Sequence, residues 1–157
     1  MQDVKSSNQT DTRKAQILIV DDHAIIREGL TMLINNEDDL QVCAAAENAE
    51  QALAEIEKDN IDLAVVDISL EGTSGLQLTE RIKARNHHLP VLILTMHDEE
   101  IYAKRAFRAG AKGFITKHEA SETVITAIRM MLAGHDYISD SMTQKFLRKL
   151  NSLEKDS

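Results

Sequence analysis

Short runs of apolar residues alternate along this chain with segments in which apolar residues recur at helical spacing. Five runs stand out: Ile17–Val20, Val42–Ala46, Ile61–Val66, Val91–Leu94 and Gly113–Thr116. Apolar side chains recur every three or four residues between and after them, as at Ile26, Leu30, Leu33 and Ile34 and again at Val124, Ile125, Ile128 and Met131. The pattern predicts five strands separated by amphipathic helices.

The five runs lack the alternation of apolar and polar residues that marks a strand with one wet face. Strands without this alternation are covered on both sides, as in parallel sheets packed between helices. The chain therefore predicts an α/β fold of the (βα)5 type, a doubly wound parallel sheet with helices on each side. Helical spacing returns near the end and predicts an extra C-terminal helix, with Met142, Phe146, Leu147, Leu150 and Leu153 on its apolar stripe.

Composition narrows the classes of function. The 157 residues carry a net charge of -8, whereas a domain that binds DNA or RNA directly normally has a basic excess. The apolar runs are far shorter than the roughly 18 residues of a membrane span. A single cysteine fits a reducing compartment. We expect a cytoplasmic domain at residues 15–136, after a flexible arm at 1–14 and before a linker and helix at 137–157.

Polar side chains follow four of the five runs directly. Asp21 and Asp22 follow the first run, Asp67 the third, Thr95 the fourth and Lys117 the fifth. Because ligand sites of open parallel sheets form at the carboxyl ends of the strands, these residues are expected at one edge. Asp22 alone would equally suit a helix cap, but three carboxylates, a hydroxyl and an ammonium together indicate a site.

Carboxylates crowded at one edge repel one another, and a hard divalent cation relieves that repulsion. Oxygen ligands favour Mg²⁺, which takes one or two carboxylates and keeps several waters. A remaining aspartate could then act as a nucleophile toward a phosphoryl group, with Mg²⁺ and Lys117 neutralising the phosphoryl oxygens. The residues predict a Mg²⁺-dependent phospho-aspartate site without saying which aspartate is modified.

Four segments in order resemble the receiver domain of bacterial two-component response regulators: VDDHAIIREGL, VVDISLEGTSGLQL, PVLILT and AGAKGFITK. The resemblance covers about residues 16–135 and points to the NarL/FixJ class. It implies a flavodoxin-like fold with strand order 2-1-3-4-5. It also implies that the chain is not an enzyme, apart from catalysing its own phosphorylation and dephosphorylation.

The resemblance assigns the phosphoacceptor and the metal ligands by position. Asp67 corresponds to the residue that a partner sensor histidine kinase phosphorylates. Asp21 and Asp22 correspond to the acidic pair that holds Mg²⁺, together with Asp67 and the backbone carbonyl of Ser69.

The resemblance also assigns a switch. Lys117 pairs with the phosphoryl group, and Thr95 is the switch hydroxyl that moves in to bond one of its oxygens. Phe114 is the switch aromatic, which turns inward into the space that Thr95 leaves. These movements reshape the face of the fourth helix, fifth strand and fifth helix, which controls dimerisation or output in similar proteins.

Two positions depart from the family pattern. Glu71 stands where relatives usually have proline, which predicts altered kinase docking or metal affinity because it adds a negative charge near the phosphoryl site. Phe114 stands where many receivers have tyrosine and has no hydroxyl to donate, so its signalling is expected to be steric.

The C-terminal residues leave the wider context open. In this class a linker helix leads to a helix-turn-helix DNA-binding domain, which we expect to lie outside the 157 residues of this chain. We expect the receiver part of a transcription regulator, a homodimer on activation, that reaches DNA only through an output domain outside this chain. The alternatives are a stand-alone receiver that signals by protein contacts and a phosphorylation-independent pseudo-receiver. An aspartate-nucleophile phosphatase would need an acid two residues after Asp21, where His23 stands.

Overall fold

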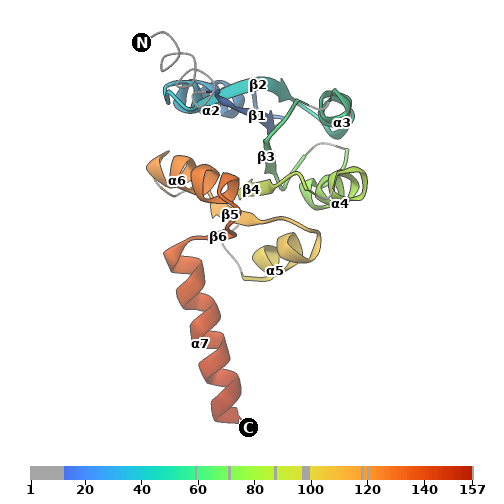
Figure 1. Cartoon of the computed structure of the whole chain (residues 1–157). Helices are drawn as coiled ribbons and strands as arrows, with labels where there is room; N and C mark the ends of the chain where they lie inside the picture. Colours follow the sequence, from blue (N-terminus) through green and yellow to red (C-terminus); the bar gives the residue numbers. More distant parts are fainter. Residues whose placement is uncertain are drawn as a thin grey trace.

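A six-stranded sheet forms the middle layer of the protein, with helices on both faces (Figure 1). The computed structural model describes residues 13–58, 60–70, 72–86, 88–96, 100–117, 119 and 121–156. Its elements are β1 (Ala15–Val20), α2 (Ala24–Asn35), β2 (Leu40–Ala46), α3 (Ala49–Glu57), β3 (Leu63–Asp67), α4 (Gly75–Arg85), β4 (Val91–Thr95), α5 (Glu100–Arg108), β5 (Gly113–Thr116), α6 (Ser121–Leu132), β6 (Tyr137–Ile138) and α7 (Asp140–Asp156).

All neighbouring strands pair in parallel, in the order β2-β1-β3-β4-β5-β6. The first five confirm the predicted α/β fold and the predicted strand order, although β3 begins two residues later than its apolar run. The sixth strand was not predicted, because two residues are too few to show a periodicity. β6 pairs with β5 at the edge of the sheet and leads into α7.

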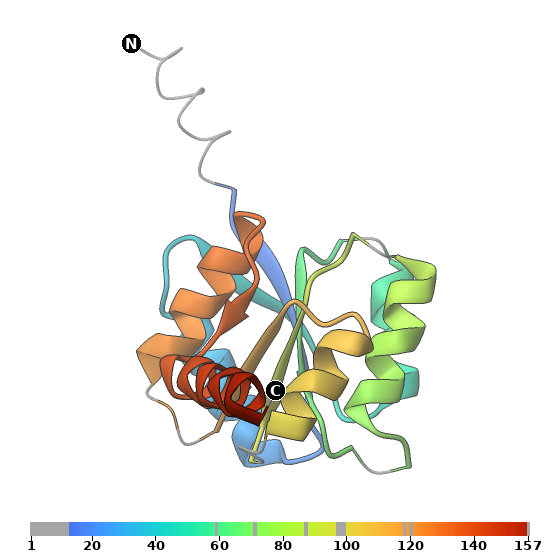
Figure 2. The same ribbon diagram turned by 90° about the horizontal axis from the view of Figure 1, so that it is seen from below.

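Four of the five apolar runs form central strands, whereas the run Val42–Ala46 lies in the edge strand β2, which is only partly buried because it has a neighbour on one side alone. Every residue of β3, β4 and β5 is buried, and so are the last four residues of β1. Helices α2 and α6 cover one face of the sheet, and α3, α4 and α5 cover the other (Figure 2). With both faces closed, the polar ends of the strands are where chemistry can reach solvent.

The predicted C-terminal helix is confirmed as α7. Its first two turns pack on the α5 side of the core through Met142, which is buried, and Phe146, which is partly buried. The helix then extends away from the sheet (Figure 1), where Leu147 and Leu150 are 54% and 56% exposed. Among the described residues, no helix has the length and apolar character needed to cross a membrane.

Candidate functional site

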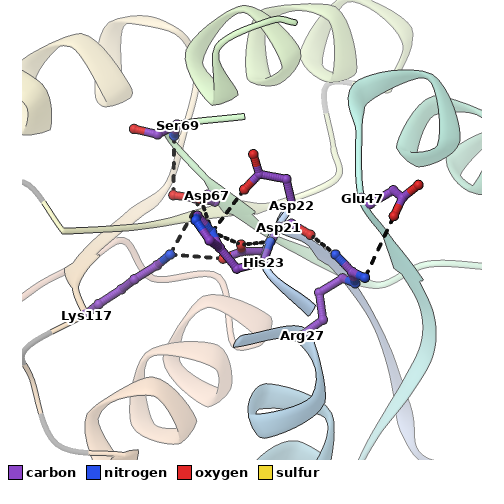
Figure 3. Close-up of polar contacts among 8 residues, drawn as sticks. All are labelled: Asp21, Asp22, His23, Arg27, Glu47, Asp67, Ser69 and Lys117. Atoms are coloured by element: carbon purple, nitrogen blue, oxygen red, sulfur yellow. Dashed lines mark hydrogen bonds and ion pairs between the residues drawn. The ribbon is translucent and has the colours of Figure 1, made fainter. Parts of the chain in front are cut away.

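The carboxyl ends of β1, β3 and β5 bring two carboxylates and one ammonium group together (Figure 3). Val20 pairs with Val66, so that Asp21, just after β1, comes beside Asp67, the last residue of β3. Lys117 follows β5, and its Nζ lies 3.0 Å from Oδ2 of Asp21 and 3.5 Å from Oδ2 of Asp67. The three side chains are no more than 10% exposed, so little solvent screens their charges.

The surroundings of Asp67 disfavour its charged form. Burial raises its pKa, and the nearby charge of Asp21 raises it further, while Lys117 and the backbone N–H of Ser69 act in the opposite direction. That N–H donates to Oδ1 of Asp67 at 3.3 Å. The other oxygen, Oδ2, is buried and accepts no hydrogen bond within the described structure. Asp67 therefore holds one buried oxygen that a cation or a new bond would satisfy.

Asp22 adds a second oxygen of the same kind. Its Oδ1 is buried and accepts no hydrogen bond from the described residues. Asp22 does not cap α2, because the N-cap residue is His23, so the helix-cap alternative is not what the structure shows. Ligand atoms of Asp21, Asp22, His23 and Asp67 all lie within 4.8 Å of one another. Three carboxylates with two unsatisfied oxygens are a donor set that fits a divalent cation.

The start of α4 is held against the end of β3. The backbone N–H of Gly75 donates to the carbonyl of Ile68 at 2.7 Å, which folds the start of α4 back against the end of β3. Ser74 caps α4 in a reciprocal capping box with Gln77. Ser69 is exposed, and its predicted role as a carbonyl ligand stays a prediction. Glu71, the predicted departure from the family pattern, lies outside the described residues.

The two predicted switch residues lie on the neighbouring strands β4 and β5. Thr95 ends β4 and is fully buried, and its carbonyl accepts the backbone N–H of Lys117 at 2.6 Å. Phe114 is 1% exposed and packs in the core cluster that also contains Ala103 and Ala106 of α5. Phe114 therefore already occupies the inward position. Its role as a switch stays a prediction.

His23 is a member of the site that the sequence reasoning missed. Its Nδ1 lies 2.9 Å from Oδ1 of Asp21, 3.0 Å from Oδ1 of Asp22 and 3.9 Å from Oδ2 of Asp67 (Figure 3). The hydrogen bond with Asp21, and then the negative charges of Asp22 and Asp21, raise the pKa of His23. The available signal was its position, directly after the acidic pair.

Arg27 is a second missed residue, and it fixes the backbone under the site. Its Nη1 donates to the carbonyl oxygen of Asp21 at 2.7 Å, and its Nη2 lies 3.9 Å from Oε2 of Glu47. Because Arg27 stands one helical turn after the N-cap residue, its side chain reaches back over the β1–α2 loop (Figure 3). Sequence spacing does not predict this contact, because the contact depends on the conformation of the β1–α2 loop.

Comparison with known proteins agrees with this geometry. A family described as the response regulator receiver domain matches residues 17–129, which include most of the sheet and the whole acidic cluster. The chain belongs to the response regulator receiver domain family. The predicted resemblance is thereby confirmed, and the match favours the receiver over the phosphatase alternative.

Named relatives place this receiver among NarL/LuxR-type regulators. It is 36% identical over 135 residues to the oxygen regulatory protein NreC of Staphylococcus carnosus, covering 85% of this chain and 62% of that protein. It is 30% identical over 147 residues to the transcriptional regulatory protein DegU of Brevibacillus brevis, covering 94% of this chain and 62% of that protein. The receiver thus spans less than two thirds of the length of these relatives.

Solved structures show the same fold. A two-component response regulator of the LuxR family from Aurantimonas is 34% identical, with a TM-score of 0.83 over 87% of this chain and 97% of that one. The signal receiver domain of the response regulator NarL from Mycobacterium tuberculosis is 25% identical, with a TM-score of 0.74 over 78% of this chain and 99% of that one. Both support the NarL/LuxR assignment.

Proposed function

We propose that this receiver accepts a phosphoryl group on the carboxylate of Asp67. The observation that carries the proposal is the buried Oδ2 of Asp67, which accepts no hydrogen bond among the described residues and lies 3.5 Å from Nζ of Lys117. A buried carboxylate oxygen that accepts no hydrogen bond is costly to keep, and a bond to a phosphoryl group beside the Lys117 ammonium would satisfy it. The donor is a phosphohistidine of a sensor histidine kinase.

Transfer also requires a divalent cation, which we propose to be Mg²⁺. The ligands are carboxylate oxygens of Asp21, Asp22 and Asp67 and the carbonyl of Ser69. The carboxylates converge within 4.8 Å, and two of their buried oxygens have no hydrogen-bond donor in the described structure. The bound cation supplies positive charge beside the phosphoryl oxygens.

The side chains of the receiver carry out the rest of the reaction. An oxygen of Asp67 forms a bond to phosphorus while the bond from phosphorus to the donor nitrogen breaks, and that nitrogen keeps the electron pair. Lys117 holds its positive charge beside the transferred group. Hydrolysis of the aspartyl phosphate reverses the modification, and the receiver catalyses both steps itself.

The added charge then biases a two-state switch. Thr95 moves to donate its hydroxyl to the phosphoryl group, and Phe114, which pairs with Ile93 of β4 and already points inward, holds that inward position in the phosphorylated state. Phe114 packs against α5, so a change at β4 and β5 reaches the surface of α5, β5 and α6. We propose that this surface controls homodimerisation and output.

The biological setting is also a proposal. DegU is by name a transcriptional regulatory protein and NreC an oxygen regulatory protein, which supports transcription control as the output. DNA contact would require an output domain beyond the residues of this chain, with α7 as the connecting helix. Phosphotransfer from a kinase of this kind places the receiver in the cytoplasm. A stand-alone receiver is the alternative if no output domain is joined to α7.

Intact mass spectrometry tests the phosphoacceptor. The protein is incubated with Mg²⁺ and acetyl phosphate, alongside Asp67→Asn and the matched control Asp38→Asn, whose carboxylate is exposed. We expect one phosphoryl adduct on the parent and on Asp38→Asn, and none on Asp67→Asn. An adduct that survives in Asp67→Asn would reject Asp67. A parent that forms no adduct would favour the pseudo-receiver.

Sizing chromatography tests the switch separately. The parent and Thr95→Val, which keeps the shape of the buried side chain but removes the hydroxyl, are compared before and after phosphorylation. We expect both to form the adduct and only the parent to shift toward a dimer. A full shift in Thr95→Val would remove Thr95 from the mechanism.

A further inference from the structure

The side chain of His23 does not cap α2, although His23 is the N-cap residue of that helix. Helix N-caps favour Ser, Thr, Asp or Asn, because their oxygen accepts a backbone N–H of the first turn. His23 is the N-cap of α2, and it makes no side-chain capping bond. Its imidazole turns instead toward the acidic cluster, with 62% of the side chain exposed.

The backbone around His23 is fixed in this position. Its own N–H donates to Oδ1 of Asp21 at 2.8 Å, and its carbonyl accepts the first helical hydrogen bond, from the N–H of Arg27, at 3.0 Å. The guanidinium of Arg27 holds the carbonyl of Asp21 from the other side. The ring is therefore attached to a backbone that is held at three points.

The two carboxylate oxygens of Asp21 contact different side chains. Lys117 takes Oδ2 at 3.0 Å, and Nδ1 of His23 takes Oδ1 at 2.9 Å. The same Nδ1 lies 3.0 Å from the unsatisfied Oδ1 of Asp22 and 3.9 Å from the unsatisfied Oδ2 of Asp67. The nitrogen thus faces the oxygens that would surround a cation.

These separations are those of atoms that share one metal ion. Two adjacent ligands of an octahedral ion with bonds of about 2.1 Å stand about 3.0 Å apart. The distances from Nδ1 to the nearest oxygens of Asp21 and Asp22 match this spacing. The 2.9 Å contact with Asp21 is also a hydrogen-bond distance, but the single hydrogen on Nδ1 can point at only one of the two oxygens, and Oδ1 of Asp22 accepts no hydrogen bond in the described structure. A metal ion in place of that hydrogen would contact both oxygens.

We infer that Nδ1 of His23 is a ligand of the divalent cation, which makes this site prefer first-row transition-metal ions such as Mn²⁺ over Mg²⁺ more strongly than its carboxylates would alone. The inference rests on the proposed cation site of the preceding subsection. Imidazole nitrogen binds first-row transition metals well, whereas Mg²⁺ keeps to oxygen. The cation takes the place of a proton on Nδ1, and the carboxylates remain its other ligands.

Pulsed electron paramagnetic resonance with Mn²⁺ reads the nitrogen directly. A bound imidazole gives a nitrogen coupling in the echo modulation of Mn²⁺. The parent is compared with His23→Phe, which keeps a ring on an exposed position, and with the matched control His135→Phe, an exposed histidine in the segment between α6 and β6. We expect the coupling in the parent and in His135→Phe and its loss in His23→Phe. A coupling that persists in His23→Phe would overturn the inference.

Affinities measured by calorimetry give an independent reading. Loss of groups that only orient a metal ligand already costs about 10–100-fold in affinity, so His23→Phe should weaken Mn²⁺ binding by at least about tenfold. Mg²⁺ binding should change much less. Equal changes for the two cations, in either direction, would show that the ring acts through charge alone and would overturn the inference. Failure of the parent to bind either cation would instead reject the proposed cation site.

Discussion

A Cβ atom on Gly75, the first residue of α4, would overlap the backbone carbonyl oxygen of Asp67, the last residue of β3. The overlap is with backbone atoms, so no flexible side chain can move aside. The end of β3 and the start of α4 are therefore packed as closely as two backbones allow. This contact fixes where the candidate site lies relative to α4.

We predict that Gly75→Ala destabilises the fold by about 1–3 kcal/mol, as overpacking of a close contact does. The matched control is Gly29→Ala in α2, where nothing lies within 4 Å of the added methyl group. Gly29→Ala should be neutral or stabilising by up to about 1 kcal/mol, because alanine favours a helix over glycine. Urea unfolding checks both, and equal stability of the two variants would contradict the prediction.

We predict that Lys117 stabilises the folded state and also speeds phosphoryl transfer. Its Nζ lies 3.0 Å from Asp21 and 3.5 Å from Asp67, so Lys117→Met removes a full positive charge from beside two buried carboxylates. We expect a loss of about 1–3 kcal/mol in the free energy of unfolding and a slower formation of the phosphoryl adduct. Lys149→Met is the matched control, on an exposed part of α7.

Denaturant curves without added metal and adduct formation followed by mass spectrometry separate the two roles of Lys117. If Lys117→Met unfolded at the same urea concentration as the parent, the electrostatic account of the site would be wrong.

Phe114 is predicted to be a large contributor to the core. It is fully buried between β4, β6 and α5, so Phe114→Ala should cost about 3–5 kcal/mol. Phe107→Ala, which removes a partly buried ring packed on the same cluster, serves as the comparison and should cost less. Thermal unfolding checks the order of the two losses, and the reverse order would show that Phe114 is held loosely.

Arg129 connects α6 to the turn between α2 and β2. Its Nη2 donates to Glu37 at 2.6 Å and to Oδ1 of Asp39 at 2.8 Å, and its Nε donates to Oδ2 of Asp39 at 3.0 Å. The bidentate hydrogen bonds lower the pKa of the Asp39 carboxyl. A carboxyl with a lowered pKa in the folded state adds stability above its unfolded pKa of 3.8 and loses it as the pH falls through the folded pKa.

We therefore predict that Arg129→Gln lowers stability at pH 7 by less than about 1 kcal/mol, because the ion pair is exposed to solvent. The difference from the parent should shrink as the pH falls below 3.8 and as salt is added. Arg108→Gln, on an exposed arginine of α5, is the control. Melting temperatures across pH check this, and a difference that grows toward acid pH would reverse the sign assigned to Asp39.

Much of this protein could be predicted from its sequence because the relevant signals are local. The apolar runs at Ile17–Val20 and Val91–Leu94 are buried strands because a run without alternation needs cover on both faces. The polar residues that follow such runs must lie at one edge of a parallel sheet. That rule alone put Asp21, Asp67 and Lys117 within reach of one another, and the structure brings them together.

Tertiary structure decided the contacts that depend on how loops and strands meet. The pairing of Val20 with Val66 sets which oxygens of Asp21 and Asp67 face Lys117. The fold of the β1–α2 loop turns His23 into the acidic cluster, and the pairing of β6 with β5 adds a new edge strand to the sheet. The periodicity of apolar residues predicts which residues are buried. The register of the strands and the conformation of the loops determine which groups each buried residue contacts. The strands could therefore be predicted from the sequence alone. The contacts of His23 and Gly75 could not, because they form only when segments distant in the sequence fold together.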